Sequence, residues 1–345
     1  MKNAGVTGFR DAGRRSSSVV ILAVWVLFFL AALAVAVGAY VSANLALAER
    51  NRYSAKARCL AAAGAEQAFF ILMTDTNAWD GPGEAWNSDI EDGLWSVSIG
   101  AGGFSVVSGG EESFGLSDEE SRINLNSAGR PLLEALLVRV GDLDPLTAGE
   151  TASAVMDWRD RNQDVLTGGA ENEYYQNLRP PYECRDGAIG CIEELLLIKG
   201  INEEVAARIG PHVTLYGRGK ININTAGREA LECLAVSHCR GETDVALAVV
   251  ERIVDFREAG GQFTEPSIPS VMAALHGFEP LEPEERGVLA AMMADAEIRS
   301  SCFRGTSTGW VERAGGKGSG EIQAGYRIAF VFDRENDTVL DWRER

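Results

Sequence analysis

Asp160, Asn162 and Asp164 place three oxygen-bearing side chains two residues apart in one short polar segment. In a loop, this alternation can direct all three side chains towards one point. Hard cations such as calcium require a point of this kind, because they take roughly 6 to 8 oxygen ligands. Glu171 and Glu173 follow after a Gly-Gly turn and are the candidates to complete the shell. No glycine follows Asp164, as it would in an EF-hand, and a solvated acidic loop that binds no cation is the alternative interpretation.

The cysteines and histidines offer little material for catalysis. The chain has six cysteines but no Cys-x-x-Cys motif, which argues against redox catalysis and structural zinc. Cys184 and Cys191 are close in sequence, as are Cys233 and Cys239, so each pair is a candidate disulfide that would close a short loop. Only three histidines are present, which is too few for a histidine-rich metal site. We therefore expect a protein that is not an enzyme.

The acidic composition restricts the classes of partner. The 345 residues carry a formal net charge of -18 at pH 7. Binding to a polyanion requires a basic surface, so nucleic acid is disfavoured, whereas cations and basic protein surfaces are favoured. The length predicts about two domains, and the 46% hydrophobic content is sufficient for their cores.

An uncharged apolar run covers residues 19–41 and continues into a helical pattern without a proline or a turn. Roughly 20 apolar residues are enough to cross the ~30 Å hydrocarbon core of a bilayer as a helix. A secretory signal would be shorter and would end at a cleavage site made of small residues. Four basic residues precede the run against one aspartate, which places the short leader in the cytoplasm. We expect a single-pass protein of the bacterial inner membrane whose C-terminal part lies in the periplasm, where disulfides can form.

The helical pattern beyond the apolar run has a single apolar stripe. The stripe recurs at steps of three and four residues and consists of Tyr53, Ala57, Leu60, Gly64, Ala68 and Ile71. Small residues in its middle would allow a sheet or a partner helix to approach closely. The Gly-Pro-Gly segment at 81–83 lies beyond the end of this helix.

Alternating patterns predict strands on both sides of a helical block. Residues 94–99 and 104–107 form one predicted hairpin, and residues 325–332 and 338–340 form another. The residues between about 118 and 299 have the texture of helices. The glycine-rich segment 305–320 predicts a mobile loop between strands. A helical block is therefore expected to interrupt a small sheet.

The helical block contains an internal repeat. Residues 122–128 (Arg-Ile-Asn-Leu-Asn-Ser-Ala) recur at 220–226 as Lys-Ile-Asn-Ile-Asn-Thr-Ala, and residues 154–160 are echoed at 249–258. We expect the asparagines, and then Ser127 or Thr225, to cap the helix that follows each copy. Two related helical units in tandem are the interpretation.

These motifs, taken in order, resemble the type II secretion system protein K family, the large minor pseudopilins. The resemblance extends over essentially the whole chain and rests on both repeat copies and on segments 157–160, 169–175, 193–200 and 340–343. It implies an α+β fold with a pilin-like long N-terminal helix on a small antiparallel sheet. A large all-α domain with two helix-hairpin-helix-like repeats would be inserted in that sheet.

The expected division of the chain follows from this resemblance. Residues 1–17 would be the cytoplasmic leader and 18–75 the transmembrane and stalk helix. The sheet would comprise 76–118 and 300–345, and the inserted helical domain 119–299, with repeats near 122–215 and 220–298. The resemblance also implies bound calcium in the helical domain, for which the loop at Asp160 is the best candidate.

The same resemblance implies assembly at the tip of a pseudopilus. The partners would be I-like and J-like minor pseudopilins and the inner-membrane platform of the secretion system. Family members are cut by prepilin peptidase after a glycine, and Ser17 occupies that position here, with Ser18 as the new N-terminus. Leu22 stands where most pseudopilins have a glutamate that neutralises the terminal amine of a neighbour. A tip subunit has no neighbour above it, so an apolar residue fits there, although Leu22 also suits any membrane helix.

A membrane-anchored DNA receptor is the alternative function. Residues 198–209 are the nearest match to the helix-hairpin-helix modules of such receptors, which present backbone amides to phosphate. The remaining hairpins lack clean Gly-x-Gly turns, and the acidic charge disfavours phosphate. We therefore favour the minor pseudopilin.

Overall fold

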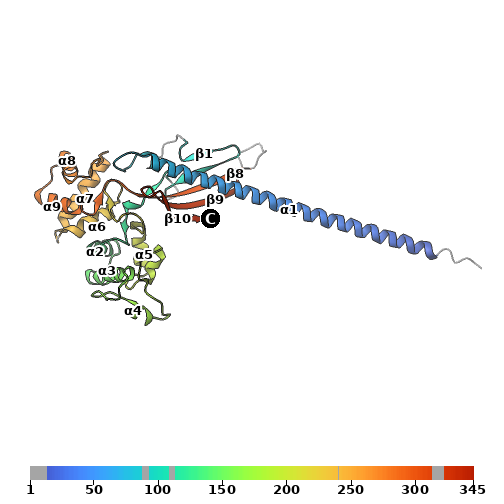
Figure 1. Cartoon of the computed structure of the whole chain (residues 1–345), viewed down its shortest axis with the longest axis horizontal. Helices are drawn as coiled ribbons and strands as arrows, with labels where there is room; N and C mark the ends of the chain where they lie inside the picture. Colours follow the sequence, from blue (N-terminus) through green and yellow to red (C-terminus); the bar gives the residue numbers. More distant parts are fainter. Residues whose placement is uncertain (1–13, 88–92, 109–112, 240, 313–321) are drawn as a thin grey trace, which may run out of the picture.

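The structure is a computed structural model that describes all residues except 1–13, 88–92, 109–112, 240 and 313–321, and residues 14–18 by their backbone only. A long helix, α1 (Arg14–Thr74), projects from a head that combines a sheet with a helical block (Figure 1). The expected α+β class is confirmed, with an antiparallel sheet against the head-proximal end of α1. Lys2 and Arg10 of the expected leader lie outside the described residues.

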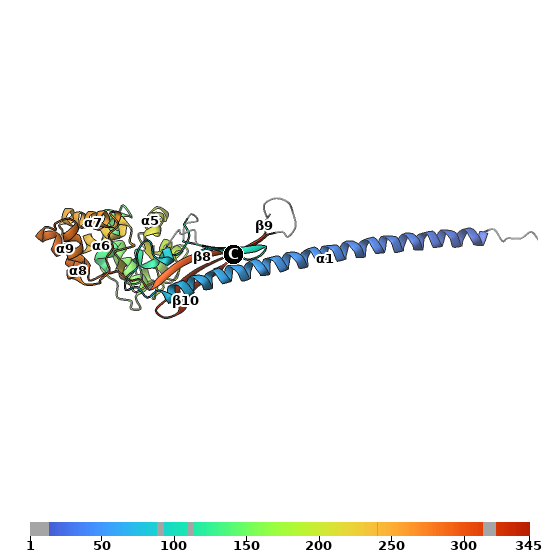
Figure 2. The same ribbon diagram turned by 90° about the horizontal axis from the view of Figure 1, so that it is seen from above.

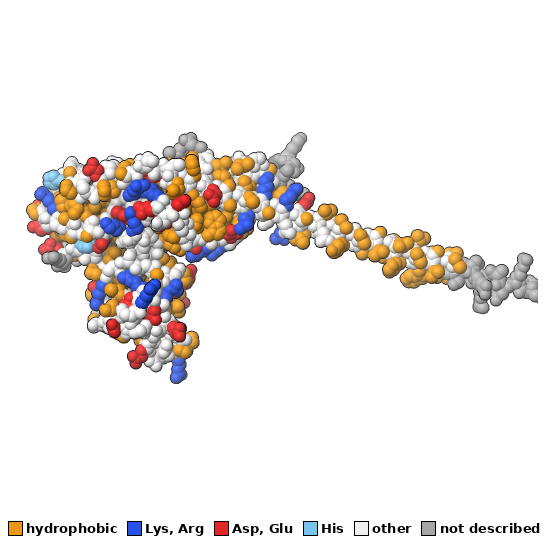
Figure 3. All heavy atoms as spheres, in the orientation of Figure 1, with side chains coloured by type: hydrophobic (Ala, Val, Ile, Leu, Met, Phe, Trp, Pro, Cys, Tyr) orange, Lys and Arg blue, Asp and Glu red, His pale blue; other side chains and the backbone are white. Residues whose placement is uncertain are grey.

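The first half of α1 has no protein around it. Its large apolar side chains are exposed, Trp25, Phe28 and Phe29 to 66–67%. Figure 3 shows this half as a nearly continuous hydrophobic cylinder. Among the described residues, α1 is the helix long and apolar enough to cross a membrane. Its composition agrees with the expected single-pass anchor.

The second half of α1 packs on the sheet through the predicted apolar stripe. Ala57, Ala61 and Ala68 are fully buried, and aromatic side chains of the sheet complete this core. Phe69 stacks on Phe332 with ring centroids 4.3 Å apart. The sheet has the order β1-β2-β8-β9-β10, with β3 paired to β8. Its strands are β1 (Ser96–Ser98), β2 (Gly102–Val107), β3 (Ser117–Asp118), β8 (Cys302–Glu312), β9 (Ile322–Asp333) and β10 (Thr338–Glu344).

The predicted loop at 305–320 is wrong in its first part, because β8 runs through it to Glu312. The glycines serve close packing rather than flexibility. A Cβ on Gly309 would lie 2.2 Å from the backbone oxygen of Ala57, and one on Gly305 would meet Leu116 and Phe330. On the α1 side of this contact, a Cβ on Gly64 would lie 2.2 Å from the Ser307 hydroxyl oxygen. Small residues on both partners therefore let helix and strand approach closely, as expected for the stripe.

The helical block lies between β3 and β8 in sequence and occupies the end of the head farthest from the free half of α1 (Figures 1 and 2). It has two units, each closed by a two-residue parallel pairing. In the first unit β4 (Ile123–Asn124) pairs with β5 (Val213–Thr214), and in the second β6 (Ile221–Asn222) pairs with β7 (Ala296–Glu297). The helices of the first unit are α2 (Arg130–Arg139), α3 (Pro145–Arg159), α4 (Asn172–Gln176) and α5 (Glu203–Ile209). Those of the second are α6 (Arg228–His238), α7 (Thr243–Glu258), α8 (Ile268–Phe278) and α9 (Pro283–Met292).

Four short 3₁₀ helices complete the head. They are η1 (Ala85–Asn87), η2 (Glu119–Ser121), η3 (Ile192–Leu197) and η4 (Gly210–His212). η1 contributes the buried Trp86 to the core beneath α1, and η2 leads from the sheet into the helical block.

The repeated asparagines do not cap helices, contrary to the expectation. Gly129 and Gly227 are the N-caps of α2 and α6, without side-chain cap bonds. In each unit the second asparagine instead exchanges two hydrogen bonds with a distant backbone. Asn126 bonds Ile189 at 2.7 and 3.1 Å, and Asn224 bonds Phe263 at 2.9 Å twice.

In each unit, an arginine near the C-terminal end of the second helix makes equivalent hydrogen bonds. Arg159 of α3 donates to the backbone oxygens of Leu125 and Ala128. Arg257 of α7 donates to those of Ile223 and Ala226. The sequence repeat is therefore also a repeat of tertiary contacts.

Candidate functional site

A cluster of carboxylates lies at the C-terminal end of α3, on the protruding side of the helical block. Ligand atoms of Asp157, Asp160 and Glu171 all lie within 4.8 Å of one another, and a second group joins Glu171 to Cys184 and Asp186. Asp157 belongs to the last turn of α3 and Asp160 is its C-cap, and the loop that follows returns to place Glu171 against them. Four acidic side chains therefore converge on one small region.

Glu171 is the buried centre of this cluster. Its side chain is 2% exposed, and neither carboxylate oxygen has a hydrogen-bond partner among the described residues. Burial first, and then the negative charges of Asp157, Asp160 and Asp186, raise the pKa of Glu171 to about 7. A buried carboxylate without donors is costly in its charged form, whereas a bound cation would stabilise it. The residues therefore fit a hard cation.

The neighbouring carboxylates of Asp157 and Asp186, unlike that of Glu171, accept hydrogen bonds. Asp157 accepts hydrogen bonds from the backbone amides of Leu166 at 3.2 Å and Ala170 at 2.8 Å. Burial is the main cause that raises the pKa of Asp157, and the amides oppose it. One oxygen of Asp186 accepts from Gln163 and Asn172, whereas its other oxygen is buried without a described partner. An oxygen-rich shell thus surrounds Glu171.

The predicted ligands are only partly brought together. Asp160 and Glu171 lie in the cluster, but Asp164 and Glu173 belong to neither group of ligand atoms in the described chain. Asp160 and Asn162 are engaged in the loop itself, since their Oδ1 atoms accept from the backbone amides of Asn162 and Asp164 at 2.9 and 2.7 Å. Glu173 is exposed on α4.

Sequence reasoning missed Asp157 and Asp186. Asp157 belongs to a helix, so its carboxylate was not expected to reach a loop site. One signal in the sequence was available for the site as a whole: counted from Asp160, Glu171 is the twelfth residue, where an EF-hand carries its bidentate glutamate. The spacing therefore matches an EF-hand loop except at the glycine position.

Neither expected disulfide is formed, because all six cysteines are free thiols. Cys233 lies within α6 and Cys239 is its C-cap, so six residues of helix separate them by about 9 Å along the axis, which is beyond bridging distance. The Cys184 thiol points towards the backbone oxygens of Asp157 and Trp158 at 3.9 Å, and Cys191 is the N-cap of η3.

The positions expected to act in processing and assembly lie on α1. The backbone of Ser17 and Ser18 is helical and continuous with the apolar segment. Leu22 is 66% exposed within that segment. These positions have no described neighbours in the head, so any role they have is exerted on lipid or on another protein.

Comparisons with known proteins agree on one family. Residues 115–218 match the profile of the family described as "Type II secretion system (T2SS), protein K". Type II secretion system protein K of Aeromonas hydrophila is 23% identical over 243 residues, which cover 65% of this chain and 67% of that protein. The protein of the same name from Klebsiella pneumoniae is 26% identical over 171 residues, 45% of this chain and about half (51%) of that relative.

A solved structure shares the fold. It is a chain of the GspK-GspI-GspJ complex of the enterotoxigenic Escherichia coli type 2 secretion system. The match has a TM-score of 0.57 at 16% sequence identity and covers 88% of this chain and 99% of that chain. At this identity the likeness concerns the fold alone.

Proposed function

Because this chain belongs to the type II secretion system protein K family, we propose that it is a minor pseudopilin at the tip of a type II secretion pseudopilus. Its work is assembly for protein export rather than catalysis. The observation that carries the proposal is the placement of the helical block, which lies beyond the head-proximal end of α1 and opposite its apolar half.

This placement supports a role in initiating or capping the filament. Pilin-like subunits stack along their long helices, so a neighbour added above would have to occupy the volume of the helical block. The block is large, with eight of the nine α-helices in the described chain, and its buried core extends through both units. Subunits can still join below and beside it, through the exposed half of α1.

The anchor supports insertion in the bacterial inner membrane, with the N-terminus cytoplasmic and the head periplasmic. Leu22 leaves the anchor without a glutamate, which fits a subunit that has no terminal amine above it to neutralise. The proposed partners are I-like and J-like minor pseudopilins and the inner-membrane platform. Prepilin peptidase would cut between Ser17 and Ser18.

Calcium is the proposed cation of the carboxylate cluster. Asp157, Asp160 and Glu171 would hold it, with Asp186 beside them. A bound divalent ion would neutralise the buried Glu171 and tie the end of α3 to the loop that follows. This would stiffen the first unit of the block.

Labelling of assembled filaments tests the position of the chain. A gold-binding tag at the C-terminus of the full chain is visualised by electron microscopy on pseudopili assembled with the other pseudopilins. We expect gold at one end of each filament. Gold along the shaft would contradict the tip role, and retention of duplex DNA by the purified chain at physiological salt would favour the receptor instead.

A matched pair of anchor variants tests the role of Leu22. Leu22 and Leu27 are equally exposed, at 66%. Leu22→Glu would supply the missing carboxylate and allow incorporation into the shaft, whereas Leu27→Glu adds the same charge at another level. We expect shaft labelling with the first variant only. Equal labelling patterns for the two variants would mean that position 22 has no special role.

A further inference from the structure

Basic side chains surround α1 immediately beyond its apolar part. Between residues 42 and 65 the sequence has four basic residues and a single acidic one, Glu49, although the whole chain carries a net charge of -18. Three of the four, Arg50, Arg52 and Lys56, are named here the basic collar, and all three are exposed. Figure 3 shows Lys and Arg side chains at the point where the hydrophobic cylinder meets the head.

The charges of the collar are not neutralised by the rest of the molecule. Arg58, the fourth basic residue, is paired with Glu344 of β10 at 2.8 Å. The three collar residues form no ion pair with the described part of the chain, and the Arg52 guanidinium lies 5.3 Å from the ring centroid of Tyr53. The collar can therefore bind an anion that lies outside this chain.

The collar goes around the helix and does not follow one face of it. Each residue of an α-helix is rotated by about 100° from the one before. Arg52 and Lys56 are therefore rotated by about 200° and 240° from Arg50, which places them on the opposite side of α1. One partner helix or domain would cover a single side. A layer of lipid headgroups surrounds a membrane helix and meets both sides.

The collar also lies at the level of that layer. Leu47 is 55% exposed, so the apolar surface of α1 continues to within three residues of Arg50. Arg50 and Arg52 lie about 3 and 6 Å beyond Ala48 along the helix axis. The headgroup layer is roughly 5–7 Å deep on each side of the hydrocarbon. Lys56, about 12 Å beyond Ala48, can extend its long side chain back towards the layer.

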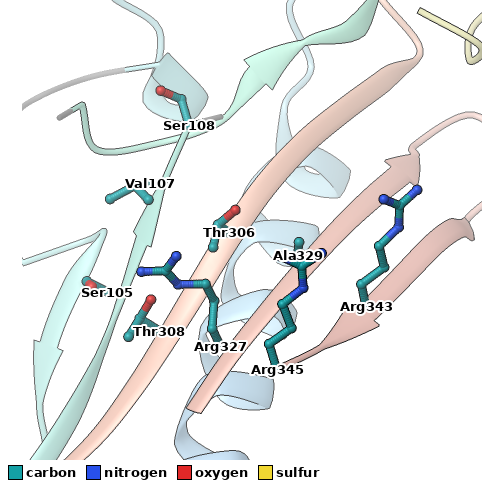
Figure 4. A pocket seen from close by; sticks show the side chains of 9 residues that line it. All are labelled: Ser105, Val107, Ser108, Thr306, Thr308, Arg327, Ala329, Arg343 and Arg345. Atoms are coloured by element: carbon teal, nitrogen blue, oxygen red, sulfur yellow. The ribbon is translucent and has the colours of Figure 1, made fainter. Parts of the chain in front are cut away.

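A second group of arginines on the head lies too far from the apolar part of α1 to belong to the collar. Figure 4 shows Arg327, Arg343 and Arg345 on one side of the strands, with α1 behind them, where they line a groove. The neighbouring Glu344 contacts α1 at Arg58, which is ten residues or about 15 Å beyond the apolar part. This group is therefore above the headgroup layer.

The uncharged part of α1 is longer than a bilayer is thick. Residues 19–48 correspond to a helix of about 45 Å, whereas the hydrocarbon core measures ~30 Å. Such a helix can tilt or shift along its axis while its apolar side chains still fill the core. The apolar surface alone therefore does not fix the depth of the anchor, and contacts of the collar with headgroups would favour one depth.

We propose that the basic collar binds the anionic headgroups of membrane phospholipids and so holds α1 at one depth in the bilayer. The negative surface of a membrane attracts each Lys or Arg that lies near it. This inference rests on the membrane anchor and not on the tip role. It goes beyond the proposed function because it assigns lipid binding to named residues of the stalk.

Native mass spectrometry of the full chain in detergent tests the binding. The chain is titrated with phosphatidylglycerol or with phosphatidylcholine of the same acyl chains, and the dissociation constant is taken from the bound fraction. We expect tighter binding of phosphatidylglycerol. Glycerol 3-phosphate carries the charge without the acyl chains and should not displace the lipid. Full displacement would mean a simple anion site and would overturn the proposal.

Two variants of the collar test the role of its charge. The triple variant Arg50→Gln, Arg52→Gln, Lys56→Gln should reduce the preference for phosphatidylglycerol over phosphatidylcholine by roughly tenfold. The charge-conserving variant Arg50→Lys, Arg52→Lys, Lys56→Arg should retain it. Because the three positions are exposed, the melting temperature of both variants should be unchanged, which checks the fold.

A matched control separates the collar from the remaining basic residues. The variant Arg179→Gln, Lys220→Gln, Arg299→Gln removes the same charges from exposed positions of the head and should keep the preference for phosphatidylglycerol. Lipid bound at the basic leader contributes equally to this control and to the collar variant, so their difference reports the collar. Equal preferences in the two would overturn the proposal.

Cys59, an exposed free thiol on α1, allows the depth to be measured. A fluorophore on Cys59, in a chain that also carries Cys191→Ser, is quenched by lipids with a spin label on the headgroup. We expect stronger quenching in nanodiscs that contain phosphatidylglycerol than in nanodiscs of phosphatidylcholine alone, and no such difference in the triple glutamine variant of the collar. Equal quenching of the unmodified collar in both nanodiscs would refute its effect on depth.

Discussion

Removal of the Arg334 side chain should strongly lower the stability of the head. It follows β9, and its side chain is 4% exposed. The guanidinium donates to Asp75 at 3.0 Å and to Asp80 at 2.9 Å, and it lies 5.1 Å from the ring centroid of Phe303. Asp80 in turn accepts the Ser300 amide at 2.7 Å. Two ion pairs of one buried arginine thus link the segment after α1, the segment before β8 and the β9–β10 turn.

The variant Arg334→Met leaves the buried Asp80 carboxylate without its counter-ion. Removing one partner of a buried pair costs about 3–5 kcal/mol, because the remaining charge stays desolvated. Domains of 150–250 residues lose roughly 2–4 °C of melting temperature per kcal/mol. We therefore expect a melting temperature lower by about 10 °C, measured by thermal unfolding of the full chain in detergent. The control Arg343→Met breaks an exposed pair and should cost about 1 kcal/mol or less.

The stability loss in Arg334→Met should also depend on pH. Burial raises the pKa of Asp80 to about 6 even though Arg334 lowers it, so the loss of Arg334 must raise the pKa further. A folded state with a raised carboxyl pKa binds more protons than the unfolded state, and its stability therefore falls as the pH rises through that window. The penalty of Arg334→Met should be smaller at pH 5 than at pH 8. Asp80→Asn in the same chain should recover part of the loss at pH 8.

Two results would refute this reasoning. One is a loss below about 1 kcal/mol at pH 8, which would mean that water or relaxation compensates Asp80. The other is a penalty that does not change between pH 5 and pH 8, which would mean that the cost comes from packing against Phe303 and not from charge.

Three further predictions concern the candidate site, the close packing and the repeat. In the absence of divalent cations, the stability of the head should fall as the pH rises from about 4.5 to about 7, because Glu171 is protonated preferentially in the folded state. Glu171→Gln should remove this slope, and calcium at roughly 100 times its Kd should stabilise the unmodified chain, but not this variant, by about 2.7 kcal/mol in thermal unfolding. Gly309→Val should lower the melting temperature sharply because its Cβ has no space, whereas Gly325→Val should be near neutral because a Cβ built there meets no atom of the described residues within 4 Å. Asn224→Ala and Asn126→Ala should each cost about 1–3 kcal/mol in urea unfolding, since each leaves the backbone groups of one distant residue unpaired.

The long helix was predictable because its signal is local and periodic. An apolar run and a stripe at steps of three and four residues require no knowledge of the partner. The same rules failed at β8, where Gly305 and Gly309 suggested a loop. Those glycines are required by close contacts with residues distant in sequence, such as Ala57 on α1. A single sequence does not show such contacts.

The candidate site shows the same limit. Asp160 and Glu171 were identified because they lie in one segment with a ligand-like spacing. Asp157 was hidden in a helical pattern, and Asp186 enters only because the fold brings a later loop beside Glu171. The asparagines of the repeat have side chains suited to capping, but their partners, Ile189 and Phe263, are 63 and 39 residues away. In each case the sequence indicated a candidate polar side chain but did not indicate its tertiary partner.

The length and continuity of α1 have a mechanical consequence. Its 61 residues contain no proline and correspond to a rod of about 90 Å. The interlocking of Gly64 with Ser307 and of Gly309 with Ala57 prevents the rod from sliding or turning against the sheet. A push or a twist applied at the apolar end of α1 would therefore reach the head with the same displacement and the same rotation.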